Sequence, residues 1–283
     1  LPEVQTIVDQ LNETLTGKTI TGVEVRLPKM FQGDKAQVTG KKIIGVTRRA
    51  KMIIINLEGP LSIVIHLKMT GQLIYADKDL ISFSNPIPFA GTTLPGKTTH
   101  VIIKLKGPAP SGVEASLYFN DMRQFGWMKI MNDEDLKIVD EKHGPEPFSD
   151  NFTEDYLKKI CSNWGRPVKI LLLEQSKIAG IGNIYANEVL WYAGISPMKR
   201  GREVVKIKEL YDAIKKVLEM GIKYGGSSAS DEAFVNAHGV GGKMQEHFMV
   251  YQKNGTPCPR CGKTITRSTI GGRGTFFCPK CQN

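Results

Sequence analysis

Four cysteines at the end of the chain constrain its fold more than any other feature. They form two pairs, Cys258-x2-Cys261 and Cys278-x2-Cys281, with sixteen residues between the pairs. This spacing is typical of a four-thiolate zinc site, with a redox or disulfide role as the alternative. Four thiolates fill a tetrahedral site, so the pattern predicts one structural zinc ion. A segment this short has too little core to fold alone, so metal binding must supply its folding free energy.

Between the cysteine pairs, the stretch RSTIGGRGTFF predicts a β-hairpin with glycines at its turn. The segment from Gly255 to the last residue has no acidic side chain, and its basic residues are Arg260, Lys263, Arg267, Arg273 and Lys280. An arginine held between glycines at a hairpin tip can donate to a DNA phosphate, and a solvated turn arginine is the plainer alternative. We therefore take Arg273 as a candidate nucleic-acid contact.

The 283-residue chain has a net charge of +10 and an isoelectric point of about 9.3. This excess points to a polyanionic partner, nucleic acid before membrane, with a merely basic protein as the alternative. The composition, 41% hydrophobic and 23% charged, is that of a globular protein. No apolar run reaches the ~18 residues of a membrane span, and the start lacks a signal-peptide pattern. We therefore expect a cytoplasmic protein without a membrane partner.

The first half of the chain reads as one helix followed by strands. In residues 2–16 apolar side chains recur at helical spacing, and Gly17 is a C-terminal stop. From 18 to 132, β-rich stretches broken by glycine, proline and asparagine predict a β-sandwich or barrel. Within this region, residues 83–98 are predicted to form a long loop.

The second half turns helical after a linker. Cys161 lies alone in an apolar helical pattern and is predicted to be a small buried residue. The chain is thus predicted to be an α+β multidomain protein. Its predicted boundaries are 1–132 for the helix and sandwich, 133–150 for the linker, 151–226 for the helical domain, and 227–283 for a loop and the finger.

Seven motifs occur in order along the chain: LPEVQTI, RRAKMIIINL, HLKMTG, NDMRQFG, HGPEPFSD, GIGNIYANEVLWYAGISP and GGRGTFFCPKCQ. In this order and over its whole length, the chain resembles the bacterial formamidopyrimidine-DNA glycosylases. LPEV, GNIYANE and GRGTFFCPKCQ are closer to the branch that removes oxidised purines than to the endonuclease VIII branch. The resemblance implies an N-terminal helix on a β-sandwich, a helix–two-turn–helix domain and a zinc finger, with DNA held between the two halves.

The resemblance implies a bifunctional enzyme of base-excision repair. Family members flip the damaged nucleotide, remove 8-oxoguanine or formamidopyrimidines through a Schiff base, and cut the abasic strand by β,δ-elimination. It implies a monomer that acts on damaged double-stranded DNA with zinc as its only cofactor. Glu3 is implied in proton transfer around the opened ribose and Lys51 in lesion handling and phosphate contact. Arg273 is implied to grip phosphate at the lesion.

Met69, Arg123 and Phe125 match the family's wedge, which fills the gap left by the flipped nucleotide. The arginine is implied to face the orphaned cytosine. A bulky wedge offsets the cost of unstacking because it replaces the lost stacking. Taken singly, Met69 and Phe125 would be ordinary core residues. Residues 227–248 correspond to a variable loop that closes over the flipped base.

Lys169 and Asn183 match phosphate-binding positions of the family's helical domain. The GIGN turn before a helix would also expose backbone amides to an anion. His100 matches a position at which the family often has a DNA-contacting histidine, although Thr98 is the histidine in some members. A family lysine has no counterpart around NWGRP, and Arg166 could substitute for it.

The chain departs from the family pattern at its start. Family members carry proline and glutamate before LPEV, and the amine of that proline forms the Schiff base, whereas this sequence opens at Leu1. An N-terminal amine suits this role because its pKa near 8 leaves more free base than lysine has. The sequence lacks its first residues, or the chain is a non-catalytic binder of damaged or abasic DNA, or another amine acts. The Leu1 amine would lie about 7 Å from the expected place, which is too far for catalysis.

Overall fold

The computed structural model describes residues 1–77, 81–108, 112–228 and 234–282, without the side chains of 81–86. The described residues group into two compact units. The sandwich unit comprises Pro2–Ile138 and Ile222–Gln245. The helical unit comprises Leu1, Val139–Gly221 and Glu246–Asn283. The two are described separately below.

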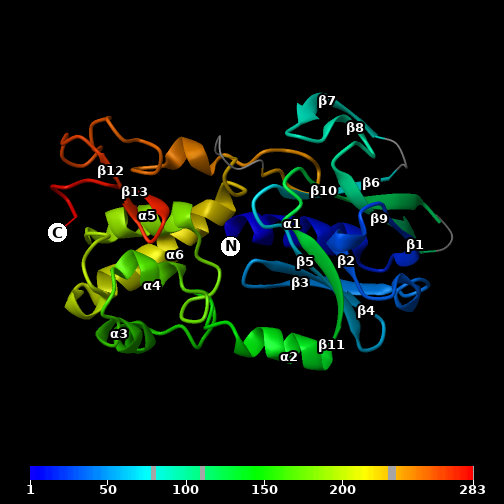
Figure 1. The fold of residues 1–283 in the computed structure, drawn as a ribbon, viewed down its shortest axis with the longest axis horizontal. Coiled ribbons are helices and arrows are strands. Elements are labelled where there is room, and N and C mark those ends of the chain that lie inside the picture. The colour runs from blue at the N-terminus through cyan, green and yellow to red at the C-terminus, as the bar shows by residue number, and fades with distance from the viewer. Residues whose placement is uncertain (78–80, 109–111, 229–233, 283) are drawn as a thin grey trace. The chain divides into compact units, whose positions relative to one another are not determined.

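In the sandwich unit, helix α1 (Pro2–Leu15) packs beside an antiparallel four-stranded sheet and a mixed five-stranded sheet (Figure 1). In spatial order, the four-stranded sheet contains β1 (Thr19–Val25), β9 (Thr99–Lys106), β10 (Glu114–Asp121) and β6 (Gly71–Ala76). The five-stranded sheet contains β2 (Phe31–Gln32), β11 (Trp127–Asn132), β5 (Leu61–His66), β4 (Met52–Leu57) and β3 (Ile43–Arg49), with β2 parallel to β11. The predicted sandwich is confirmed.

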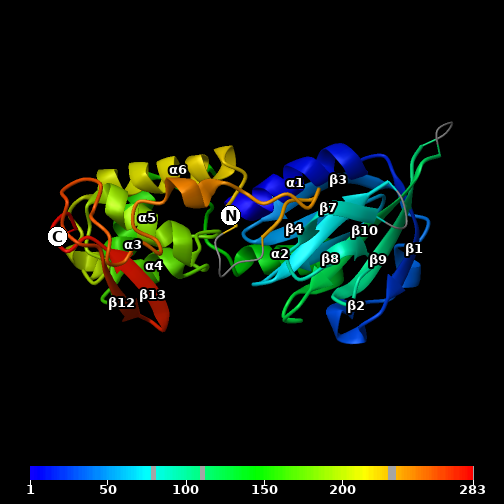
Figure 2. The same cartoon turned by 90° about the horizontal axis from the view of Figure 1, so that it is seen from above.

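The apolar face of α1 packs into the hydrophobic core of this unit. Ile7, Leu11 and Leu15 are fully buried in one cluster with side chains from both sheets. Figure 2 shows α1 lying along β3, the strand with which it makes its main contacts. Gly17 ends the helix with a positive φ of 88°, as the sequence predicts.

The predicted loop at 83–98 is wrong in part, because it contains a two-stranded ribbon. The strands are β7 (Ile81–Ile87) and β8 (Gly91–Leu94). Their register shifts between Ser82 and Ile87, where Pro86 lies. A proline cannot donate to a ladder, but it is tolerated where pairing is interrupted and both strands are edges. The prolines that suggested a loop therefore fit an irregular ribbon.

A helix that the sequence analysis overlooked lies in the predicted linker. Helix α2 (Asp133–Glu141) has three acidic residues in its first turn. Their negative charges interact favourably with the positive N-terminal end of the helix dipole. The Asn132 side chain accepts from the Asp135 amide, and the Asp135 side chain accepts from the Asn132 amide. This reciprocal capping is a local signal that the sequence does contain.

The helical unit contains the remaining long helices and the finger, and these bear out the helical domain predicted after the linker. Its helices are α3 (Glu154–Ser162), α4 (Val168–Leu173), α5 (Asn183–Ala193) and α6 (Ile207–Lys223). The finger hairpin is β12 (Thr266–Ile270) and β13 (Arg273–Phe277), and Cys161 is buried as predicted. Among the described residues, short 3-10 helices also occur in both units, at Pro28–Met30, Lys35–Gln37, Gly201–Glu203 and Met244–His247. None of the helices in the described ranges is both long and apolar enough to cross a membrane.

Residues after α6 return to the sandwich unit, whereas the predicted boundaries place 227–283 together. The Ala237 amide donates to Gln10 of α1 (3.0 Å), and its carbonyl accepts from the Tyr75 amide of β6 (2.8 Å). The predicted lesion-capping loop includes residues 229–233, which lie outside the described residues. Of its described residues, 227–228 and 234–245 thus belong to the same unit as α1, and 246–248 belong to the helical unit.

We expect Leu11→Ala to destabilise the sandwich unit by about 2–5 kcal/mol, because it leaves a cavity between α1 and both sheets. Glu13→Ala, on the exposed side of the same helix, should change stability by less than about 0.5 kcal/mol. Urea unfolding of both variants measures the difference. Equal stability of the two variants would show that α1 is not a core element.

Candidate functional site

Two neighbouring turns of the sandwich unit present an unusual exposed cluster. Met69, in the β5–β6 turn, is 48% exposed, and Phe125, in the β10–β11 turn, is 54% exposed. The guanidinium of Arg123 lies 4.9 Å from the centre of the Phe125 ring. The alternative that Met69 and Phe125 are ordinary core residues is therefore wrong. We call Met69, Arg123 and Phe125 the exposed triad.

The backbone of both turns takes conformations that side chains disfavour. Lys68 (φ 54°) and Gln124 (φ 55°) are left-handed although neither is glycine. Gly126 follows Phe125, and a Cβ there would lie 2.8 Å from Phe119 and 3.0 Å from the His66 carbonyl. The turns therefore need fixed partners to hold the exposed triad in place.

Asp121, at the end of β10, supplies these partners. It is fully buried, and its Oδ1 accepts from the Thr70 hydroxyl and from the Arg123 amide (3.1 Å). Its Oδ2 accepts from the Gly126 amide (2.7 Å). The Arg123 amide also donates to Thr70 Oγ1 (3.1 Å). Asp121 and Thr70 thus connect the two turns, a role that the sequence analysis missed although both residues stand inside quoted motifs.

Glu3 and Lys51 lie on connected elements of the same unit. Glu3, in the first turn of α1, accepts from the Ser227 amide (3.2 Å). Lys51 stands in the β3–β4 turn after Ala50, which is left-handed (φ 53°). Arg48 donates both to Gln5 of α1 (2.7 Å) and to the Ala50 carbonyl (2.9 Å). The turn that carries Lys51 is therefore tied to the helix that carries Glu3.

His100 is placed differently from what a DNA contact requires. Its side chain is 6% exposed, and its ring donates through Nε2 to the Asp121 carbonyl (2.8 Å). Its DNA contact stays a prediction, and the burial argues against a direct one. Thr98, the alternative position, is half-buried and donates to the Phe89 carbonyl (3.1 Å).

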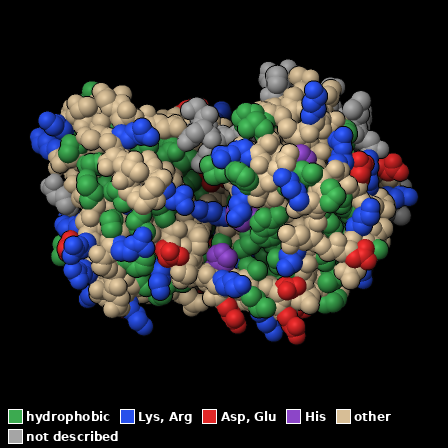
Figure 3. Space-filling view, in the orientation of Figure 1, with side chains coloured by type: hydrophobic (Ala, Val, Ile, Leu, Met, Phe, Trp, Pro, Cys, Tyr) green, Lys and Arg blue, Asp and Glu red, His purple; other side chains and the backbone are tan. Residues whose placement is uncertain are grey.

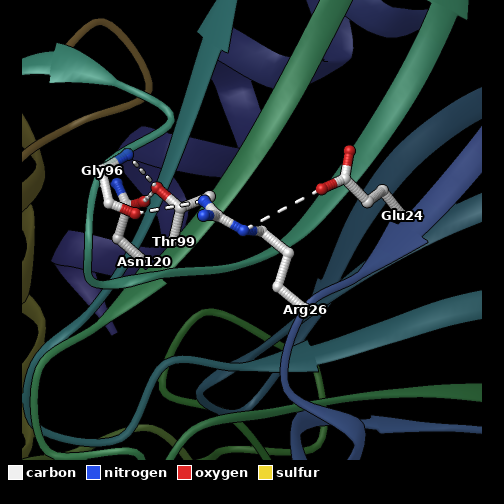
Figure 4. A network of polar contacts seen from close by, with 5 residues as sticks. All are labelled: Glu24, Arg26, Gly96, Thr99 and Asn120. Carbon is white, nitrogen blue, oxygen red and sulfur yellow. Dashed lines mark hydrogen bonds and ion pairs between the residues drawn. The ribbon is translucent and has the colours of Figure 1, made fainter.

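The loop before His100 is held by a polar network, shown in Figure 4. The Thr99 hydroxyl accepts from the Gly96 amide (2.9 Å) and donates to Asn120 Oδ1 (2.7 Å). Arg26 donates to the Gly96 carbonyl (3.2 Å). Both Thr99 and Asn120 are buried. The loop before His100 is therefore fixed by hydrogen bonds to its neighbours.

In the helical unit, Arg273 is presented as the sequence predicts. Gly271 (φ 58°) and Gly272 (φ 72°) form a two-residue turn between paired Ile270 and Arg273. Positive φ at both positions is what a tight hairpin turn of this kind requires. Arg273 is exposed at the first position of β13. Lysine and arginine side chains are spread over the face drawn in Figure 3.

Lys169 and Asn183 meet beneath this hairpin. Lys169 Nζ donates to the Gly274 carbonyl (2.7 Å) and to Thr275 Oγ1 (2.8 Å). Asn183 Nδ2 donates to the same carbonyl (3.2 Å), while its Oδ1 is buried and has no partner among the described residues. Burial, and then the charge of Arg273, lower the pKa of Lys169 to about 7. Lys169 thus contacts the hairpin backbone, and its phosphate contact stays a prediction.

The four cysteines fit zinc. Their sulfur atoms all lie within 4.8 Å of one another, with 3.5 Å between Cys261 and Cys278 and 4.0 Å between Cys258 and Cys281. Four Zn–S bonds of about 2.3 Å in a tetrahedron require sulfurs about 3.8 Å apart. The thiolate set leaves no position for a substrate, so the zinc is structural.

Helix α5 connects this metal centre to the rest of the helical unit, which spacing alone did not reveal. Asn187 Oδ1 accepts from the Phe276 amide (2.8 Å). Trp191 donates through its indole nitrogen to the Cys258 sulfur (3.4 Å). The fully buried Glu188 accepts from the amides of residues 249–251, at 2.8–3.0 Å. Burial raises the pKa of Glu188, and these amides act against that shift.

Three family descriptions match the chain in succession. Residues 1–128 match the formamidopyrimidine-DNA glycosylase N-terminal domain, and residues 143–233 match the H2TH domain of the same enzymes. Residues 255–283 match a zinc finger found in FPG and IleRS. The matches follow the order in which the structure presents the sandwich, the helices and the finger.

Similar proteins span nearly the same length. Formamidopyrimidine-DNA glycosylases of Chloroflexus aurantiacus and Pelotomaculum thermopropionicum are 38% and 39% identical over all of this chain, which covers 96% and 98% of them. Among solved structures, Lactococcus lactis Fpg with abasic-site DNA has a TM-score of 0.84 at 34% identity, covering 100% of this chain and 99% of that one. MutM (FPG) of Thermus thermophilus has a TM-score of 0.85 at 34% identity, with 100% and 98% covered.

We expect Cys278→Ser to lose the metal, whereas Arg273→Ala should keep about one zinc per chain, because only the first change removes a ligand. Metal analysis of the purified proteins measures this. Limited proteolysis should find the finger digested in the cysteine variant alone. Loss of zinc from Arg273→Ala would mean that the arginine is needed for the fold of the finger.

We expect Lys169 to make stability depend on pH. Its folded pKa of about 7 lies below the ordinary 10.5, so the unfolded chain binds more protons between these values and stability rises with pH across this range. Lys169→Met should flatten that rise. Urea unfolding of both proteins at about pH 7 and about pH 9.5 measures the difference. Equal slopes would contradict a lowered pKa for Lys169.

Proposed function

The chain belongs to the formamidopyrimidine-DNA glycosylase family, and we propose that it excises oxidised purines from duplex DNA and cuts the resulting abasic strand. The observation that carries the proposal is the exposed triad, in which Met69 and Phe125 lie uncovered beside Arg123 on two connected turns. Exposed apolar side chains backed by a buried polar base are unusual in a surface that only faces water. They suit insertion into a base stack.

The exposed triad supplies what base flipping requires. A duplex hides the glycosidic bond of the target, so the nucleotide must leave the stack at a cost of a few kcal/mol. Met69 and Phe125 enter the gap and replace the lost stacking. Arg123 lies against the Phe125 ring and donates to the orphaned cytosine, because a guanidinium presents several donors in one plane.

The chemistry belongs to groups around α1. The family reaction begins with an amine that attacks C1′ and releases the base, leaving an imine with an opened ribose. Glu3 then moves protons at the opened sugar, and β- and δ-elimination release the flanking phosphates. Lys51 contacts the lesion and its phosphate and holds them in position. The ties between α1 and the β3–β4 turn keep these two residues in a fixed relation.

The finger hairpin grips the DNA backbone. Arg273 is the phosphate contact. Lys169 and Asn183, which match phosphate-binding positions of the family, donate to the Gly274 carbonyl next to it and so support the hairpin that carries Arg273. An arginine on a rigid turn loses little freedom when it binds, so its charge-assisted hydrogen bonds are strong. The zinc supplies the folding free energy of this hairpin and takes no part in the reaction.

The proposed partner is damaged double-stranded DNA, on which the chain acts as a monomer. The net charge of +10 favours this association and makes it sensitive to salt. A repair enzyme works where the DNA is, and we therefore propose a cytoplasmic location. A non-catalytic binder is not favoured, because the family match runs through the N-terminal domain that contains Glu3 and Lys51 as well as through the finger.

We expect the protein, preceded by the Met-Pro-Glu start of the family and with the Met removed so that the proline amine is free, to form a covalent adduct with an 8-oxoguanine duplex when borohydride is present. Reduction traps the imine, and denaturing gels show the adduct and the excised product. If the gels show neither the adduct nor the excised product, the proposal is overturned.

Two finger variants refine this assay. Arg273→Ala should weaken DNA binding and strand cleavage about tenfold or more, because a charge-assisted contact to phosphate is lost. Lys263→Ala, which removes another exposed cation of the same finger, should reduce both by less. Equal losses in the two variants would mean that Arg273 contributes only charge and no specific contact.

A further inference from the structure

We propose that Thr70 and Asp121 are positioning residues that join the two turns of the exposed triad, so that the wedge enters DNA as one body. The inference rests on the proposed function. Met69 stands on one turn and Arg123 with Phe125 on the other, and each turn crosses between the two sheets of the sandwich. Without a connection, each turn could move by itself.

The Thr70 hydroxyl is the connection itself. Thr70 directly follows Met69 in sequence and is buried, with 7% exposure. Its hydroxyl donates to Asp121 Oδ1 and accepts from the Arg123 amide (3.1 Å). One oxygen on the first turn therefore bonds to two residues of the second, and one of these, Arg123, is itself a member of the exposed triad.

Asp121 holds the second turn through its carboxylate and its backbone. Its two carboxylate oxygens accept from the amides on either side of Phe125, at Arg123 and Gly126. Its own backbone amide donates to Thr98, and its carbonyl accepts from His100. Hydrogen bonds to a buried carboxylate are stronger than those between neutral groups. The aspartate thus fixes the turn at both of its ends.

The strained backbone shows why such a connection is needed. Lys68 and Gln124 are left-handed, each one residue from a triad member. Conformations of this kind persist only where the surroundings determine them. On one side the His66 ring accepts from the Lys68 amide (3.0 Å), and on the other the carboxylate of Asp121 holds the flanking amides. Releasing the connection would let both turns relax away from the inserting geometry.

The consequence differs between two substrates. Removal of 8-oxoguanine from an intact pair requires the wedge to offset unstacking of a base. An abasic site has no base to unstack, so cleavage there depends less on the wedge. Loss of the connection should therefore slow excision more than it slows cleavage at a preformed abasic site.

The experiment compares Thr70→Val, which keeps the shape and removes the hydroxyl, with Thr70→Ser, which keeps the hydroxyl. Single-turnover rates are measured for excision of 8-oxoguanine opposite cytosine and for cleavage of an abasic duplex. Thr70→Val should slow excision about 10- to 100-fold, as expected for losing a hydrogen bond to a charged group. The same variant should lose several-fold less of the cleavage rate on the abasic duplex. Thr70→Ser should retain most of the excision rate of the unsubstituted protein.

Thr99→Val is the matched control. Thr99 is also a buried threonine of the sandwich unit, with a hydroxyl between the Gly96 amide and Asn120, as Figure 4 shows. It should lower stability without changing the ratio of the two rates. If Thr99→Val changes this ratio as much as Thr70→Val does, the effect is one of general stability and the proposal fails.

A second measurement tests the route of the effect. In a Phe125→Ala background, Thr70→Val should add little further loss of excision, because the connection acts through the wedge. Full additivity would overturn the proposal. Should Thr70→Val not fold, Thr70→Cys, whose thiol is a weak donor, takes its place under the same criteria. All variants carry the family's N-terminal start used in the borohydride assay, and absence of excision by the unsubstituted protein in this form would instead refute the proposed function.

Discussion

The functional segments of this protein depend on one kind of interaction, the hydrogen bonds that backbone amides donate to a buried carboxylate. Asp121 accepts hydrogen bonds from the amides on either side of Phe125 in the sandwich unit. Glu188 accepts hydrogen bonds from the amides of 249–251, the segment before the finger. A buried charge is costly unless it is fully hydrogen-bonded. The segments that supply these bonds are therefore held firmly although they lie outside regular strands and helices.

The exposed groups rest on these fixed segments, and this combination suits an enzyme that must open a duplex. Met69 and Phe125 remain uncovered because the hydrogen bonds beneath them, and not packing around them, define their position. Arg273 is exposed in the same way on a hairpin whose Gly274 carbonyl accepts from Lys169 and whose base lies next to the four cysteines. Rigid presentation reduces the entropy lost when such groups bind.

Much of the fold could be predicted because its signals are local. The helical spacing in 2–16, the glycine pair before Arg273 and the cysteine spacing each act over a few residues, and the structure confirms all three. The ribbon at 81–94 and helix α2 were missed. In the first, irregular pairing accommodates prolines, and in the second, the Asn132 cap was present but not weighed. The family resemblance, in turn, named most of the site residues that the structure exposes.

The sequence by itself determined most of the helices and strands, the metal ligands and the residues that a family member would use, because these depend on spacing and residue type. Only the tertiary structure decided which of them are accessible. It buried His100 against Asp121 and Lys169 beneath the hairpin, and it brought Thr70 to Asp121 from 51 positions away. Such contacts depend on sheet register and packing between distant segments, which no local pattern encodes.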